Sequence, residues 1–77
     1  MIDDPVVAKQ ISDLMKDMFD RISECSRAVE QQCSPEEHKE FVRSIGNITW
    51  GIVFDVMEPL YAKHPDLAPS NWEQISQ

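Results

Sequence analysis

Apolar residues recur along residues 7–29 at steps of three and four positions. Such steps place side chains on one face of an α-helix, because a helix completes a turn about every 3.6 residues. Asp4 and Pro5 precede the pattern, and they suit the N-cap and the first helical position. We therefore predict a helix over about residues 5–31 with a single apolar face. That face consists of Val7, Ile11, Leu14, Met18, Ile22, Cys25 and Val29.

A second helix start follows almost at once. Ser34 can cap a helix, Pro35 suits its first position, and Glu37 can complete a capping box with Ser34. The apolar pattern then continues to Met57, and Pro59 lacks the N–H that an α-helix needs. We predict a helix over about residues 35–57 that either ends or kinks near this proline. Because the link is short, the two helices are expected to pack antiparallel as an αα-hairpin.

The remaining residues, 58–77, form a tail that prolines interrupt, with short helical turns expected between them. Ser70 and Glu73 repeat the spacing of a capping box, which predicts a short terminal helix over residues 70–76. Strand-like alternation is absent from the sequence. The prediction is thus one all-α domain spanning residues 1–77, an antiparallel helical hairpin with a short C-terminal helix.

The predicted second helix is apolar over an unusually wide arc. At about 100° per residue, Phe41, Ile45, Ile48, Ile52, Val56 and Leu60 form one stripe, which we expect to face the first helix. A second stripe lies about 120° away and consists of Trp50, Phe54, Met57 and Tyr61. One neighbouring helix cannot cover both stripes.

Two structures could cover this second stripe. The chain's own tail could fold back through Leu67, Trp72 and Ile75, or a second copy could complete a dimeric four-helix bundle. We favour the dimer, because so short a chain gains most from pooling two cores. The expected interface residues are Gly46, Trp50, Phe54, Met57, Tyr61 and Trp72.

The chain is acidic, with fourteen Asp and Glu residues against seven Lys and Arg and a formal net charge of −7. This balance argues against nucleic-acid binding, which depends on basic patches. Four acids share one side of the first helix. That strip could dock a basic protein partner or hold a divalent cation weakly, but a solvated helix face is the commoner meaning of such a run. Its members are Asp13, Asp17, Asp20 and Glu24.

Reactive chemistry has little support in the sequence. Neither His38 nor His64 has the spacing of a metal site, and no phosphate loop or nucleophile motif appears, so we expect no enzyme, cofactor or bound metal. Cys25 falls on the apolar face as a core residue, whereas Cys33 lies in the link as an exposed and possible redox thiol. No secretory signal and no apolar run of about 20 residues is present. A cytoplasmic location without membrane insertion is therefore expected.

These observations favour one function class over two others. The leading expectation is a small non-enzymatic protein that acts as a homodimer in protein–protein interaction or regulation. The main alternative is a small-molecule-binding protein with an aromatic cleft. A weaker third class is a redox-responsive module that works through Cys33.

Overall fold

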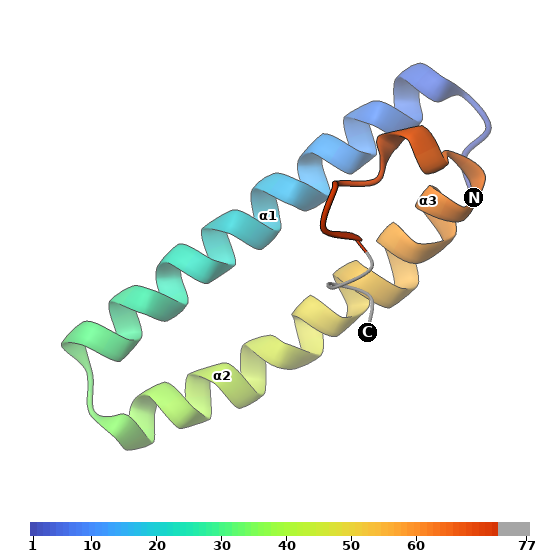
Figure 1. Cartoon of the computed structure of the whole chain (residues 1–77). Helices are drawn as coiled ribbons and strands as arrows, with labels where there is room; N and C mark the ends of the chain where they lie inside the picture. Colours follow the sequence, from blue (N-terminus) through green and yellow to red (C-terminus); the bar gives the residue numbers. More distant parts are fainter. Residues whose placement is uncertain (73–77) are drawn as a thin grey trace.

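The computed structural model of the chain describes residues 1–72, which form a hairpin of two long antiparallel helices (Figure 1). The predicted all-α helical hairpin is confirmed. The first helix ends one residue later than expected, and the second continues without interruption to Lys63. The elements are α1 (Pro5–Gln32), α2 (Pro35–Trp50), the π-helical segment η1 (Gly51–Met57), α3 (Glu58–Lys63) and the 3₁₀ turn η2 (Pro65–Leu67).

Both predicted helix starts are confirmed in detail. The Asp4 carboxylate accepts hydrogen bonds from the backbone N–H groups of Val6 at 2.8 Å and Val7 at 3.1 Å. At the start of α2, the Glu37 N–H donates to the Ser34 hydroxyl at 3.2 Å, and the Ser34 N–H donates to the Glu37 carboxylate at 3.1 Å. Each cap satisfies backbone donors that have no partner inside the helix.

The second helix accommodates Pro59 by changing from α-helical to π-helical geometry in the segment just before it. Proline has no N–H for the carbonyl four residues earlier, so a regular α-helix would lose a hydrogen bond at this point. In η1 the bonds instead reach five residues back, as when the Glu58 N–H donates to the Val53 carbonyl. Each π turn contains more residues than an α turn, so side chains after η1 are rotated by on the order of a quarter turn from their α-helical positions.

The buried core lies at one end of the hairpin, where α1 begins and α3 ends, and we call it the terminal end. Seven side chains are buried among the described residues, and all of them fall at positions 8, 12 and 52–61. No residue from 13 to 51 is buried. We call residues 13–51 the link-end half, because they contain the link between α1 and α2. The buried residues are Ala8, Ser12, Ile52, Val53, Met57, Leu60 and Tyr61.

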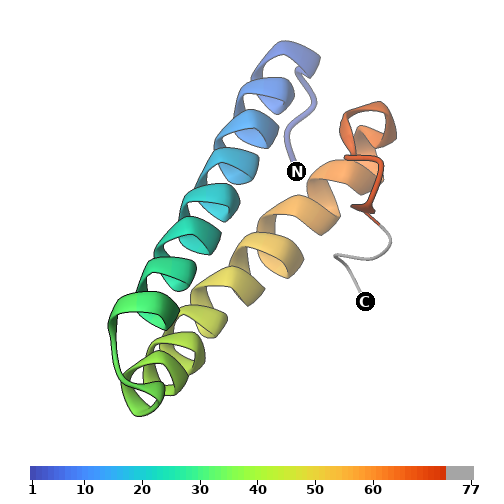
Figure 2. The same ribbon diagram turned by 60° about the vertical axis from the view of Figure 1, so that its left-hand side comes forward.

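The molecule is a thin rod. Its principal extents are 44 × 19 × 19 Å, and its radius of gyration is 14.2 Å. A compact domain of this length is expected to have a radius of gyration of about 11.5 Å. Outside the terminal end, only two helices lie side by side, so each helix has a neighbour on one side alone (Figures 1 and 2).

The face of α1 that meets the core agrees only in part with the predicted face. Ala8 and Ser12 are buried, whereas Val7 is 40 % exposed and Leu14 54 % exposed. Cys25 is exposed as well, so the prediction that it is a core residue is wrong. Ile11, Met18 and Ile22 of the predicted stripe do pack against the core, and the small Ala8 and Ser12 side chains are buried beside them.

The first residues of the chain and the described part of the tail, residues 65–72, pack at the terminal end of the rod. Leu67, Ala68 and Trp72 pack on the core, and Lys16 of α1 donates to the Leu67 carbonyl at 3.4 Å. Near the N-terminus, Lys63 forms an ion pair with Asp3 and holds the pKa of that carboxyl below its usual value. The predicted terminal helix over residues 70–76 lies largely outside the described residues.

None of the helices that the structure describes is both long enough and apolar enough to span a lipid bilayer.

Candidate interaction surface

The second apolar stripe divides at η1 into a covered part and an open part. Met57 and Tyr61 are 1 % and 3 % exposed, and their cover comes from within the chain. The rotation that η1 introduces turns them away from the line of Trp50 and toward α1. These two residues therefore leave the set that a second copy could contact, since helix positions beyond the π segment no longer follow a spacing of about 100°.

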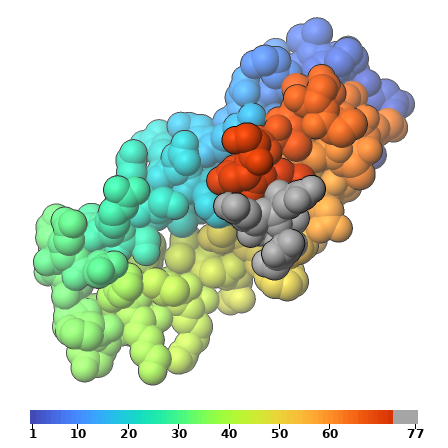
Figure 3. Space-filling view, viewed as in Figure 1, coloured from blue at the N-terminus to red at the C-terminus, as the bar shows by residue number. Residues whose placement is uncertain are grey.

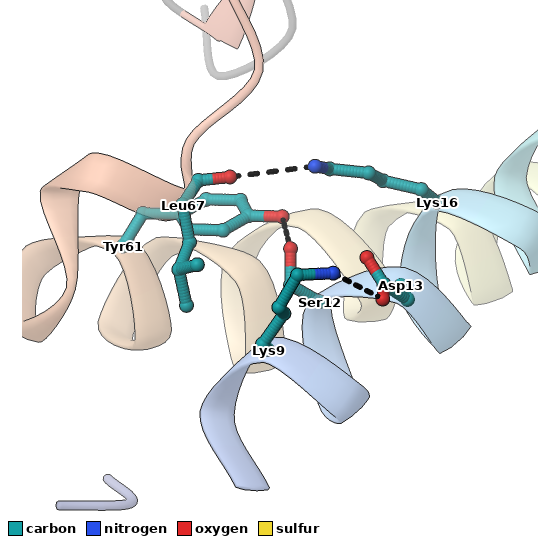
Figure 4. A network of polar contacts seen from close by, with 6 residues as sticks. All are labelled: Lys9, Ser12, Asp13, Lys16, Tyr61 and Leu67. Carbon is teal, nitrogen blue, oxygen red and sulfur yellow. Dashed lines mark hydrogen bonds and ion pairs between the residues drawn. The ribbon is translucent and has the colours of Figure 1, made fainter. Parts of the chain in front are cut away.

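Tyr61 is held on two sides. Its hydroxyl lies 2.6 Å from the Ser12 hydroxyl, a buried contact between the second helix and α1 (Figure 4). Trp72 of the tail meets the Tyr61 ring edge-on, with ring centroids 4.9 Å apart. Fold-back of the tail through Leu67 and Trp72 thus accounts for the terminal end of the stripe, and Ile75 lies outside the described residues.

Trp50 and Phe54 form the open part of the stripe. Their ring centroids are 4.1 Å apart with an interplanar angle of 40°, so the two rings support each other. Trp50 is nevertheless 64 % exposed, and it is the most exposed aromatic side chain of the described residues. An exposed tryptophan on a rigid helix, already ordered by a neighbouring ring, is typical of an interface anchor.

A groove of about 510 Å³ runs beside Trp50 between α1 and α2. None of the tail residues that the structure describes lines it, although the red segment of the tail reaches the middle of the rod (Figure 3). The side chains along it are mainly apolar or small. Its lining consists of Phe19, Ile22, Ser23, Ser26, Arg27 and Glu30 of α1, Val42, Ile45, Gly46, Thr49 and Trp50 of α2, and Val53 and Phe54 of η1.

A second hollow of about 530 Å³ adjoins the groove beneath the tail. The two share Phe19, Ser23 and Arg27, but the second is more polar, because charged side chains of α1 face the tail residues Pro69 and Asn71 across it. The remaining lining residues are Lys16, Asp20, Glu24 and Met57.

The predicted acidic strip is exposed along α1. Asp13 forms an ion pair with Lys9 at 2.9 Å, while Asp20 and Glu24 border the second hollow. Over residues 1–72, no cluster of three or more His, Cys, Asp or Glu side chains is arranged to hold a metal ion. The solvated acidic face and the docking strip for a basic partner both remain predictions.

The two thiols and the histidines are spread over the rod. Cys33 is exposed in the link, as predicted, and neither thiol forms a disulfide. His38 lies 3.8 Å from Glu30 across that link, and His64 Nε2 lies 2.6 Å from the Ile2 carbonyl at the opposite end. These groups are too scattered to assemble one reactive site.

Comparison with known proteins finds no matching family model, no matching curated protein and no matching solved structure.

Two groups of residues at this surface escaped sequence reasoning. Ser12 joins the core although it is polar, and nothing in the α1 pattern marks it as the partner of Tyr61. Ile22 was assigned to the face that meets the second helix, yet it also lines the open groove together with Phe19. The width of the apolar arc on the second helix was the available signal, because it exceeds what α1 can cover.

Proposed function

We propose that this chain is a non-enzymatic protein–protein interaction protein that acts as a homodimer through its link-end half. One observation carries the proposal: none of the residues 13–51 is buried, although apolar side chains line both helices there. A domain normally packs at least two layers around a core, and this half has a single layer. Another polypeptide surface would supply the missing layer.

The energetics favour such a partner. A chain of 77 residues is marginally stable with a lone core, and here the core occupies one end only. Covering a large apolar side chain contributes roughly 1.5–3 kcal/mol. Trp50, Ile48 and Val42 are 64 %, 55 % and 44 % exposed, so their burial would contribute several kcal/mol to an assembly.

Light scattering after gel filtration tests the homodimer. The expected mass rises from 8.9 kDa at low concentration toward twice that value as concentration increases. Trp50→Ala is expected to keep the mass near that of the monomer up to higher concentrations. Leu14→Ala removes an exposed apolar side chain on another face of α1, and it should leave the dependence of mass on concentration unchanged. A mass that stays at 8.9 kDa at millimolar concentration would contradict the homodimer.

A second candidate function has its own support in the size of the groove. Its volume of about 510 Å³ lies within the range of roughly 300–1,000 Å³ typical of small-molecule sites, and Trp50 and Phe54 offer an aromatic wall. An apolar dye such as anilinonaphthalene sulfonate should then bind with one-to-one stoichiometry and quench Trp50 in a Trp72→Phe background. Weak, non-saturating binding would dismiss this candidate.

A further inference from the structure

The edge of the second helix beside the groove, from α2 into η1, has one glycine in a row of large side chains. Val42, Gly46, Trp50 and Phe54 follow one another at steps of four residues, and all four line the groove. Steps of four residues keep side chains on nearly the same line of a helix. Gly46 is therefore a gap in the line between two exposed side chains, Val42 and Trp50.

The gap at Gly46 is empty space within the chain. A Cβ atom built on this glycine meets nothing within 4 Å, and the residue is exposed. Glycine lowers helix stability by about 1 kcal/mol relative to alanine, and no contact among residues 1–72 offsets this loss at Gly46. A gap in a row of helical side chains lets another helix or a large side chain approach closely.

This edge is complementary to itself. If two copies of α2 run antiparallel about a two-fold axis midway between Gly46 and Trp50, the order of residues is reversed in the second copy. Gly46 of each copy then faces Trp50 of the other, and Val42 faces Phe54. An isologous contact requires this kind of match, because one surface patch serves both subunits.

We propose that the gap at Gly46 receives Trp50 of a second copy of this chain, and that this reciprocal contact is the centre of the homodimer. The inference rests on the proposed function, and it adds the surface, the register and the anchoring residue. Trp50 is suited to the role, since tryptophan is enriched among the few side chains that dominate binding energy.

Charge favours a second copy over a basic partner. The chain carries a formal net charge of −7, so two copies repel each other over most of their surfaces. The groove is an exception, because its only charged lining residues are Arg27 and Glu30, whose formal charges cancel. A basic partner would be drawn to the exposed acids of α1 instead.

The area available for a dimer contact is limited. One whole face of the rod measures 44 by 19 Å, or roughly 800 Å², which is what each partner contributes to an interface of standard size, and the tail occupies part of that face. The homodimer interface would therefore lie at the lower end of the usual size range. The described part of the tail, coloured red, lies over the middle of the rod in Figure 3, so the contact would lie over the link-end half.

The test compares variants that fill the gap with a matched control. Gly46→Leu should fold, because the position is open and leucine is a better helix former than glycine. It should weaken the dimer by at least about tenfold, since it obstructs the site of Trp50. Ser44→Leu adds the same side chain at an exposed position of α2 outside the groove, and it should leave the dimer unchanged.

A compensating pair tests the register directly. Gly46→Trp alone should abolish the dimer, because two tryptophans would then meet, whereas Gly46→Trp combined with Trp50→Ala should restore it. Sedimentation equilibrium measures the dissociation constants, and far-ultraviolet circular dichroism confirms that each variant is helical.

The outcomes separate the inference from the proposed function. A wild-type dimer that Gly46→Leu weakens and the double variant restores supports both. A wild-type dimer that persists unchanged in Gly46→Leu overturns the reciprocal contact but leaves the homodimer standing. A wild-type chain that remains monomeric at millimolar concentration overturns both.

Discussion

The hydroxyl groups of Ser12 and Tyr61 lie 2.6 Å apart in the buried end of the hairpin, although 49 positions separate the two residues in the chain. Both side chains are nearly inaccessible to water, at 1 % and 3 % exposure. A buried hydroxyl without a partner is unfavourable, so each residue satisfies the other. This hydrogen bond fixes the register in which α1 and the second helix meet.

We predict that the two residues are energetically coupled. Ser12→Ala should lower the free energy of unfolding by about 1–3 kcal/mol, because it leaves the Tyr61 hydroxyl buried without a partner. Tyr61→Phe should lower the free energy of unfolding by less, because the Ser12 hydroxyl that it leaves behind can donate to the carbonyl four residues earlier in the helix. The double variant should be more stable than the sum of the two losses implies. Urea unfolding of the four proteins measures the coupling, and strictly additive losses would contradict it.

The sequence predicts the helices well because their signals are local. The Asp4 cap, the Ser34 capping box and the apolar periodicity all act within a few residues, and the structure confirms each. The failures are long-range. Which side of α1 meets the second helix depends on how Ala8 and Ser12 fit against residues about 50 positions away, and no local pattern encodes that fit.

The second failure concerns helical geometry. Assigning Tyr61 to the line of Trp50 assumed a regular α-helix from one to the other, and η1 breaks that assumption. Pro59 was the available signal, because apolar spacing that continues past a proline indicates a helix that adapts to it. Gly46, Trp50 and Phe54 line the open groove and remain predicted interface residues, whereas Met57 and Tyr61 are buried in the core of the same chain.

Pro59→Ala should show that packing holds the π segment in place. Replacing proline by alanine inside a regular helix stabilises the helix by about 3 kcal/mol. A return to α-helical geometry, however, would rotate Met57 and Tyr61 out of the core. We expect the variant to gain far less than this value in its free energy of unfolding, measured by urea. A gain close to the full amount, with the Ser12–Tyr61 contact kept, would contradict the interpretation.

The two tryptophans should differ sharply in how much each contributes to the stability of the monomer. Trp72 packs against Tyr61 and the core, so Trp72→Ala should lower the free energy of unfolding by about 2 kcal/mol, less than for a fully buried ring. Trp50 is 64 % exposed, so Trp50→Ala should change the free energy of unfolding by only about 0.5 kcal/mol.

The measurement requires a concentration at which light scattering gives the monomer mass of 8.9 kDa. At higher concentration the effect of Trp50→Ala should grow, because the wild-type dimer is then stabilised by mass action. Equal effects of the two substitutions at low concentration would mean that Trp50 belongs to the core of the monomer.

The capping box predicts a pH dependence at the start of α2. The Ser34 N–H, and with it the Ser34 hydroxyl, holds the pKa of Glu37 below its usual value. A carboxyl whose pKa is lowered by folding stabilises the folded state above its unfolded pKa of about 4.3, and this contribution is lost as pH falls through the lower folded value. Glu37→Gln retains a side chain that can accept the Ser34 N–H bond but does not titrate. The free energy of unfolding, measured in urea at neutral pH and near pH 3, should therefore fall more for the wild type than for Glu37→Gln, and parallel changes in the two proteins would contradict the role of the ionised carboxyl.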